Sequence, residues 1–221
     1  MAEKFKVSNL DLYYGDFHAL KDVNMNIEAN EITAFIGPSG CGKSTFLKLL
    51  LRFWQKSSGD ILYNGCDIDD TDSESLLENV TMVSQSTYLF NETIEDNLRI
   101  AKRNATQEEI EAACKMASVH DFIMSLPEGY HTRVGMQGDR LSAGEKQRIG
   151  LARAFLRGSG LILLDEPTSN VDSINEGIIL KALAEQKNKK GMILVSHRES
   201  TMSAADRIYR AEGGRLYDTN L

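Results

Sequence analysis

The chain lacks the features of a membrane-spanning protein. None of its apolar runs approaches the roughly 18 residues that a transmembrane helix needs, and runs such as Leu161 to Leu164 are much shorter. The opening Met-Ala-Glu-Lys carries no apolar signal region. If the protein works at a membrane, we therefore expect another chain or segment to supply the spanning part.

Cysteine is scarce as well. The three cysteines, Cys41, Cys66 and Cys114, are scattered along the chain, and no Cys-x-x-Cys pair is present. This spacing suggests neither a zinc site nor a disulfide framework. A reducing, cytosolic setting is the simplest interpretation.

An excess of positive charge is also lacking, because the formal net charge is -7. Nucleic-acid-binding surfaces need clustered Lys and Arg, so we expect no nucleic-acid partner, although the negative charge could merely aid solubility. Hydrophobic residues make up 42% and charged residues 26% of the 221 residues. That composition and length are typical of a globular protein with a sizeable core.

Short β-rich runs alternate with helical runs along the chain. We expect strands at residues 5–14, 23–27, 32–36, 60–63, 80–83, 161–164, 192–195 and 207–209, and helices at 43–53, within 93–126, at 144–157 and between 164 and 192. Thr106 and Glu109 resemble a capping box, and Gly213-Gly214 predicts a hairpin turn. The alternation predicts an α/β fold with a mainly parallel sheet, interrupted by a helical insertion.

A phosphate-binding loop follows the strand expected at 32–36. Its residues Gly37, Pro38, Ser39, Gly40, Cys41, Gly42, Lys43, Ser44 and Thr45 fit Gly-x4-Gly-Lys-Ser/Thr between a strand and a helix. The glycines let backbone N–H groups wrap around phosphates, and the helix adds its positive end. Lys43 should contact the β- and γ-phosphates and Ser44 should bind Mg²⁺. The alternative is a chance glycine-rich turn.

Two acids, Asp165 and Glu166, end the apolar strand that begins at Leu161. At the carboxyl end of a parallel strand they would face the ligand crevice, where Asp165 would hold Mg²⁺ and Glu166 would polarise the attacking water. The alternative is a pair of solvated acids. His197 and Gln85 follow two other strands and could sense the γ-phosphate and reach Mg²⁺, or they could be a structural histidine and a surface amide.

The segment Leu141-Ser142-Ala143-Gly144-Glu145 looks like the signature sequence of ABC ATPases, which usually reads Leu-Ser-Gly-Gly-Gln. Together with the loop and the paired acids, it makes the whole chain resemble that family. The resemblance implies an α/β P-loop NTPase core with a mainly parallel sheet and an N-terminal antiparallel β region. It implies one ABC ATPase domain, with the core at 1–85 and 158–221 and an inserted helical subdomain carrying the signature at 86–157.

The resemblance also assigns roles to single residues. Tyr14 looks like the aromatic that stacks on adenine, with Tyr13 as the alternative, and Asp172 looks like the acid that links two sites across a dimer. The implied catalytic set is Lys43, Gln85, Glu166 and His197; the metal set is Ser44, Gln85 and Asp165; the nucleotide set is Tyr14, residues 37–45, Ser142, Ala143, Gly144, Glu145 and Asp172. Ala143 and Glu145 depart from the usual signature.

The implied cofactors are ATP and Mg²⁺, and the implied partners are a membrane permease and a second cassette, as a homodimer or heterodimer with ATP bound. The resemblance places the protein in the cytoplasm, on the inner face of the membrane when assembled. Residues before about 50 resemble phosphate-importer ATPases, whereas later segments resemble exporter cassettes, with Met136 where exporters usually carry Glu. A hybrid joined near residues 46–52, an excised domain and a separate subunit all fit.

Two other functions stay open. One is a non-transport ABC ATPase that acts on nucleic acid or ribosomes, although such proteins usually carry tandem cassettes or basic extensions that this chain lacks. The other is a nucleotide-binding module that hydrolyses poorly. The transported substrate and the direction of transport cannot be inferred, because substrate pockets lie in the membrane partner.

Overall fold

The computed structural model describes residues 3–219, and the chain divides into two compact units. The first unit holds the residues up to Thr81, Gly160–Glu166 and the residues from Lys187 onward. The second unit holds Met82–Ser159 and Pro167–Gln186. It therefore extends beyond the helical insertion expected at 86–157 and takes in a further helix. Within residues 3–219, no helix is long and apolar enough to cross a membrane.

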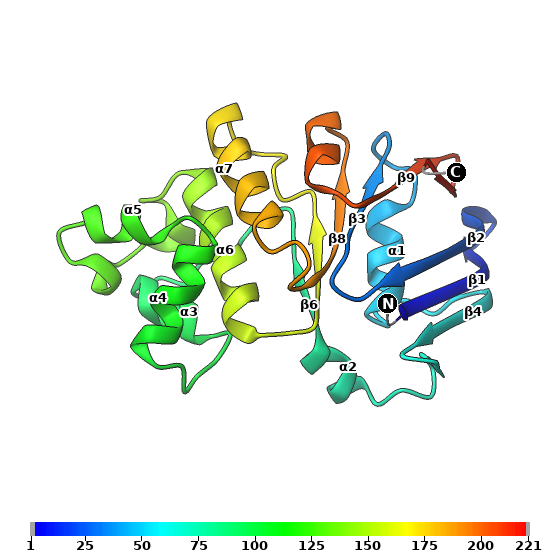
Figure 1. The fold of residues 1–221 in the computed structure, drawn as a ribbon, viewed down its shortest axis with the longest axis horizontal. Helices are drawn as coiled ribbons and strands as arrows, with labels where there is room; N and C mark the ends of the chain where they lie inside the picture. Colours follow the sequence, from blue (N-terminus) through cyan, green and yellow to red (C-terminus); the bar gives the residue numbers. More distant parts are fainter. Residues whose placement is uncertain (1–2, 220–221) are drawn as a thin grey trace. The chain divides into compact units, whose positions relative to one another are not determined.

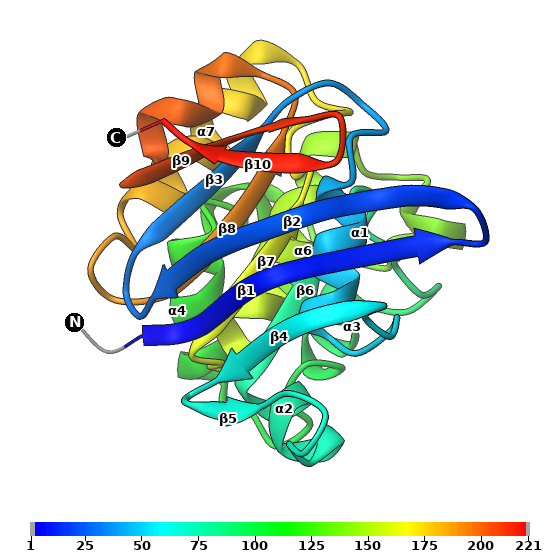
Figure 2. The same cartoon turned by 90° about the vertical axis from the view of Figure 1, so that its right-hand side faces the viewer.

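An antiparallel sheet forms one part of the first unit. Its strands are β1 (Glu3–Tyr14), β2 (Phe17–Glu28), β4 (Ser58–Tyr63) and β5 (Cys66–Asp67), in the order β2-β1-β4-β5, and Figure 2 shows them side by side. In β1 the apolar side chains Phe5, Val7, Leu10 and Leu12 are buried. A bulge shifts the register between Val7 and Leu10, which explains why the apolar alternation there is not strict.

A second sheet runs in the order β10-β9-β3-β8-β7-β6. Its strands are β3 (Ile32–Ile36), β6 (Val80–Val83), β7 (Leu161–Asp165), β8 (Gly191–Ser196), β9 (Arg207–Glu212) and β10 (Arg215–Asp218). The four central strands β9, β3, β8 and β7 are parallel, which confirms the mainly parallel sheet. Strands β3, β7 and β8 are short, nearly continuous apolar runs because both of their faces are buried, whereas buried and exposed residues alternate toward the end of β9. Gly213 and Gly214, with φ of 56° and 87°, form the expected turn.

The first unit also holds α1 (Lys43–Leu50), α2 (Ser73–Asn79) and the 3-10 helix η3 (Glu199–Ala204). The helix expected at 43–53 ends earlier, at Leu50, because Arg52 takes a left-handed conformation with φ of 56°. The sequence did not lead us to expect α2, which begins at Asp72, whose side chain accepts a hydrogen bond from the Ser75 N–H.

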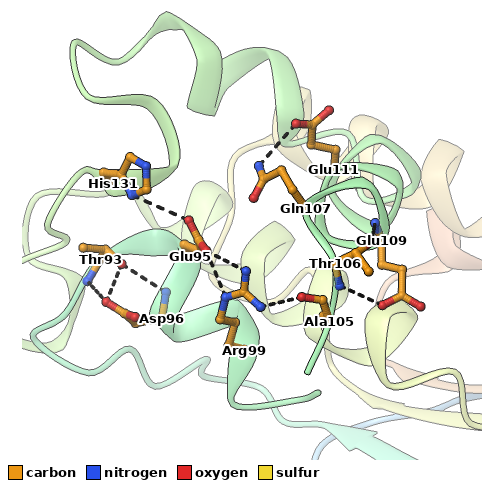
Figure 3. Close-up of polar contacts among 10 residues, drawn as sticks. All are labelled: Thr93, Glu95, Asp96, Arg99, Ala105, Thr106, Gln107, Glu109, Glu111 and His131. Atoms are coloured by element: carbon orange, nitrogen blue, oxygen red, sulfur yellow. Dashed lines mark hydrogen bonds and ion pairs between the residues drawn. The ribbon is translucent and has the colours of Figure 1, made fainter. Parts of the chain in front are cut away.

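The second unit is helical (Figure 1). Its helices are α3 (Ile94–Arg99), α4 (Gln107–Met116), α5 (His120–Ser125), α6 (Ala143–Arg157) and α7 (Ser173–Ala184), with 3-10 turns η1 (Gly129–His131) and η2 (Met136–Gly138). The expected capping box of Thr106 and Glu109 is present, and Thr93 and Asp96 form a second one at α3. Figure 3 shows both boxes.

A charged clamp joins α3 to the start of α4 (Figure 3). Arg99 donates to Glu95 Oε1 from Nε at 2.9 Å and from Nη2 at 2.7 Å, and it donates to the Ala105 carbonyl from Nη1 at 2.5 Å. The other Glu95 oxygen lies 3.6 Å from Nδ1 of His131, in η1. The Glu95–Arg99 pair of α3 therefore contacts η1 through its carboxylate and the residues just before α4 through its guanidinium group.

Candidate functional site

The phosphate loop lies between β3 and α1, as the sequence predicts. Two of its positions require glycine, each for a different structural reason. A side chain at Gly37 would place its Cβ 2.2 Å from the Ala211 carbonyl oxygen. Gly42 has φ of 99°, and a Cβ there would lie 2.7 Å from Leu20 Cδ2. Gly42 also caps α1, whose first N–H groups have no intrahelical partner and can bind an anion.

Lys43 places its ammonium group inside this loop. Its Nζ donates to the carbonyls of Gly37 and Pro38 at 2.6 and 2.8 Å and lies 3.4 Å from Cys41 Sγ. The side chain is buried, with 4% of its surface exposed. A buried cation beside inward-facing backbone is suited to a phosphate, which would form charge-assisted hydrogen bonds with both.

Ser44 and Asp165 form the candidate metal site. The Ser44 hydroxyl donates to Asp165 Oδ1 at 2.7 Å. Burial raises the pKa of the Asp165 carboxyl, and the nearby Glu166 raises it further, while the Ser44 hydrogen bond opposes both. A bound cation would offset the cost of ionising this buried carboxyl group. A hydroxyl and one carboxylate fit Mg²⁺, which takes oxygen ligands, typically one or two carboxylates with phosphates and waters.

No group of three or more His, Cys, Asp or Glu side chains within residues 3–219 could hold a metal ion. The Ser44–Asp165 pair is a smaller set of oxygen ligands beside the phosphate loop, which is the kind of set that Mg²⁺ takes.

Glu166 and His197 meet at the same strand edge. Glu166 Oε2 lies 3.3 Å from His197 Nδ1, and the Glu166 N–H donates to the Val195 carbonyl at 3.0 Å. Glu166 takes a left-handed conformation with φ of 49°, which a non-glycine residue rarely adopts and which often marks a functional position. The parallel register of β7 and β8 brings the two side chains together.

Tyr14 lies at the other side of the loop. Its hydroxyl donates to Thr45 Oγ1 at 3.3 Å, so the ring is tied to the phosphate loop. The alternative residue, Tyr13, instead stacks on His18, with ring centroids 4.0 Å apart and planes 13° apart. This placement favours Tyr14 over Tyr13 as the base-binding aromatic.

The signature segment opens α6 in the helical unit. Ser142 and Glu145 form a capping box: the Ser142 N–H donates to Glu145 Oε2 at 2.7 Å, and the Glu145 N–H donates to the Ser142 hydroxyl at 3.3 Å. Ala143 is exposed, whereas Gly144 is buried. A Cβ at Gly144 would lie 2.5 Å from Asn175 Cγ.

Asp172 joins the signature helix through a hydrogen-bonded chain. It caps α7, and its Oδ1 accepts from the N–H groups of Ile174 and Asn175, both at 3.0 Å. The Asn175 amide donates to Asp172 Oδ2 at 2.7 Å and accepts from Arg148 of α6. The Asn175 N–H is the main reason why the pKa of Asp172 is lowered. Sequence reasoning missed Asn175 and its contact with Arg148, because Asn175 belongs to no motif.

Gln85 belongs to the same helical unit. It lines a cavity of about 340 Å³ together with Ala143 and other residues of that unit. The expected site residues thus fall into two groups. The first unit holds Tyr14, residues 37–45, Asp165, Glu166 and His197, and the second holds Gln85, Ser142, Ala143, Gly144, Glu145 and Asp172.

These arrangements agree with what the chain is similar to. The family described as ABC transporter matches residues 20–169. A Haemophilus influenzae protein named as an ABC transporter ATP-binding/permease protein is 51% identical over 213 residues, which is 96% of this chain and 39% of that protein. A Staphylococcus aureus protein named as a multidrug export ATP-binding/permease protein is 41% identical over 98% of this chain and 38% of its own length.

A solved structure of a bacterial Atm1-family ABC exporter with ATP bound has a TM-score of 0.90 and is 36% identical, over 97% of this chain and 38% of that chain. The chain spans about two fifths of the relatives it matches. The chain belongs to the ABC transporter family, of which it is an ATP-binding domain.

Proposed function

We propose that this chain hydrolyses ATP with Mg²⁺ and that the hydrolysis powers a membrane permease of the exporter type. The observation that carries the proposal is one edge of the parallel sheet, where the phosphate loop lies beside two acids, each paired with a second side chain. Asp165 lies 2.7 Å from Ser44, and Glu166 lies 3.3 Å from His197. This is the set of groups that phosphoryl transfer to water needs: a phosphate cradle, a metal site and a group that orients water.

Each residue has a separate task in this reaction. Lys43 and the backbone N–H groups at the start of α1 bind the β- and γ-phosphates. Ser44 and Asp165 of the first unit would hold Mg²⁺. When bound, Mg²⁺ neutralises charge that develops on the phosphate oxygens. Tyr14 stacks on the adenine ring.

Glu166 orients the attacking water by accepting a hydrogen bond from it, and it is the proposed general base. His197 holds the Glu166 carboxylate at 3.3 Å and is placed to bind the γ-phosphate through its other ring nitrogen. Asp165 pairs with Ser44 and Glu166 with His197, so the two neighbouring acids are proposed to have different tasks.

The active form is proposed to be a head-to-tail dimer, and both units of the chain act as one ATPase domain. The signature of one chain would face the phosphate loop of the other, with the Ser142 hydroxyl and the start of α6 directed to the γ-phosphate. Ser142, Ala143 and Asp172 are exposed in the single chain and are therefore free to meet a partner. The proposed dimer is either a homodimer of this chain or a heterodimer with a second cassette that carries the same motifs.

The permease contact is proposed for an aromatic surface of the helical unit. Tyr88 and Phe90 are 56% and 51% exposed and pack edge to face, with ring centroids 5.0 Å apart. Met136 is 73% exposed, and its segment is tied to the same region, because Thr93 pairs with Arg133 in an antiparallel bridge. Exposed aromatic and Met side chains are typical of protein interfaces. The assembled protein would then lie on the inner face of the membrane.

The test is the steady-state ATPase rate per chain as a function of protein concentration, with Lys43→Ala as the control. A rate that climbs with concentration supports a site built by two chains, and Lys43→Ala should abolish it. A second candidate, a module that binds ATP without turnover, is favoured by Ala143 and Glu145 in the signature. ATP binding with no turnover at any concentration would support this candidate and contradict the ATPase.

A further inference from the structure

Trp54 is the chain's only tryptophan, and it lies beside the proposed adenine-binding residue. The rings of Trp54 and Tyr14 pack edge to face, with centroids 5.2 Å apart and planes 73° apart. The Tyr14 hydroxyl is bonded to Thr45 of the phosphate loop at 3.3 Å. The Tyr14 ring is therefore held from two directions, at its hydroxyl by the loop and at its ring by Trp54.

The end of α1 fixes the backbone that carries Trp54. The N–H of Arg52 donates to the Leu49 carbonyl and the N–H of Phe53 donates to the Lys48 carbonyl, both at 2.9 Å. With Arg52 left-handed at φ of 56°, this is a Schellman motif. Trp54 follows the motif directly, so its backbone leaves the helix in a set direction.

The left-handed conformation is unfavourable for a residue other than glycine. Hydrogen bonds of the Arg52 side chain offset this cost: Nη1 donates to the Thr71 carbonyl at 2.5 Å and to the Ser73 hydroxyl at 3.3 Å. These hydrogen bonds thus hold the strained backbone at Arg52, two residues before Trp54, in place.

The other side of Trp54 is fixed as well. The Ser57 N–H donates to the Asp11 carbonyl at 3.0 Å, and the Ser57 hydroxyl accepts from the Tyr13 N–H at 2.9 Å. Residues 51–57 are therefore anchored to α1 at one end and to the end of strand β1 at the other. Tyr14 is the last residue of β1. The segment that carries Trp54 is therefore hydrogen-bonded to the same strand that carries Tyr14, which fixes the two rings relative to each other.

Both rings keep open surface. Tyr14 is 36% and Trp54 45% exposed, although aromatic side chains of this size are usually well covered. An edge-to-face pair covers one side of each ring at most, so planar surface stays available to a base. An exposed aromatic pair beside a phosphate loop is suited to binding a purine ring.

We infer that Trp54 is a positioning residue for the base of the bound nucleotide: it sets the orientation in which the Tyr14 ring meets the purine. The inference rests on the proposed function, since it requires that ATP binds at this loop. Its ligand is the base rather than the phosphates, and this difference makes it testable separately from the loop.

The experiment compares ATP with inorganic tripolyphosphate, which has the phosphates and no base. We expect Trp54→Ala to weaken ATP binding by about 3- to 10-fold in calorimetric titration, as loss of one aromatic pair would. Tripolyphosphate affinity should stay unchanged. Trp54→Phe keeps a ring and should restore ATP binding to within about twofold.

Phe53→Ala is the matched control, because Phe53 is the neighbouring residue and is 60% exposed. It should leave both affinities unchanged. In a Tyr14→Ala background, Trp54→Ala should have no additional effect on ATP affinity, since Trp54 acts through Tyr14. Emission from Trp54 in the unmodified chain should change more on addition of ATP than of tripolyphosphate.

Equal loss of ATP and tripolyphosphate affinity in Trp54→Ala would overturn the inference, because Trp54 would then only support the loop. Unchanged ATP affinity would overturn it too, while leaving the proposed ATPase intact. If the unmodified chain binds neither ligand, the proposed function fails together with the inference. If the alanine variant does not fold, the emission of Trp54 in the unmodified chain decides, because an equal change with ATP and with tripolyphosphate would overturn the inference.

Discussion

The carboxylate of Glu145 accepts a hydrogen bond of 2.7 Å from the backbone N–H of Ser142, the residue that caps the signature helix. The usual residue at this position in ABC signatures is glutamine. In this chain the charged residue completes a capping box and places a negative charge at the positive end of α6. The departure from the usual signature therefore has a local structural role.

Glu145→Gln should change stability and dimerisation in opposite directions. The amide can keep the hydrogen bond but loses the charge, so the free energy of unfolding should fall by about 0.3–1 kcal/mol. In the proposed dimer the same change removes a negative charge beside the partner's phosphates, so ATP-dependent dimerisation should strengthen. Chemical denaturation and sizing in MgATP measure the two effects. A more stable variant with weaker dimerisation would contradict this interpretation.

Gly144→Ala should destabilise the helical unit by about 1–3 kcal/mol, because the new methyl group would lie 2.5 Å from Asn175 Cγ. Asn175 cannot simply turn away, since its amide is bonded to both Asp172 and Arg148. Thermal unfolding measures the loss, and adding Asn175→Ala should recover part of it.

Gly177→Ala is the control for this clash. Gly177 lies within α7, and a Cβ there would meet nothing within 4 Å. Alanine is the better helix former by about 0.5–1 kcal/mol, so this variant should be more stable than the unmodified chain. If both glycine variants shift the unfolding free energy in the same direction, the clash with Asn175 is not the cause.

The sequence predicted those parts of the site that depend on local pattern. The phosphate loop, the acids after β7 and the Thr106 capping box each follow from residues close together in the chain, and the structure has all three elements where expected. The early end of α1 was not predictable, because Arg52 lacks the usual glycine signal and is held by the distant Thr71 and Ser73. The role of Asn175 was not predictable either, because its partner Arg148 lies in another helix.

Asp165→Asn should stabilise the fold while abolishing metal-dependent activity. Burial raises the pKa of Asp165 in the folded chain, so its ionised form destabilises the fold. The melting temperature of the variant should therefore be higher than that of the unmodified chain at pH 7.5. ATPase activity should fall by at least about 100-fold, since an amide is a poorer ligand for Mg²⁺.

The pH dependence checks the physical reason for the stability change. Because the pKa of Asp165 is raised in the folded chain, ionisation of this group lowers the free energy of unfolding by its full amount above that pKa. The loss disappears as the pH falls below the ordinary value of about 3.9 in the unfolded chain. The difference in melting temperature between the variant and the unmodified chain should therefore shrink on acidification. A difference that stays constant from pH 7.5 to the acid limit would rule out ionisation of Asp165 as its source.

Glu166→Gln should preserve ATP binding and slow hydrolysis by about 10²- to 10⁴-fold, because the amide cannot take a proton from the attacking water. His197→Ala should also slow hydrolysis but less than Glu166→Gln, since it removes the group 3.3 Å from the Glu166 carboxylate and leaves that carboxylate in place. If Glu166 is the base and His197 acts partly through it, the double variant should be slowed by less than the product of the two single effects. Single-turnover rates at saturating MgATP separate hydrolysis from binding. Hydrolysis at the unmodified rate in Glu166→Gln would assign the base to another residue.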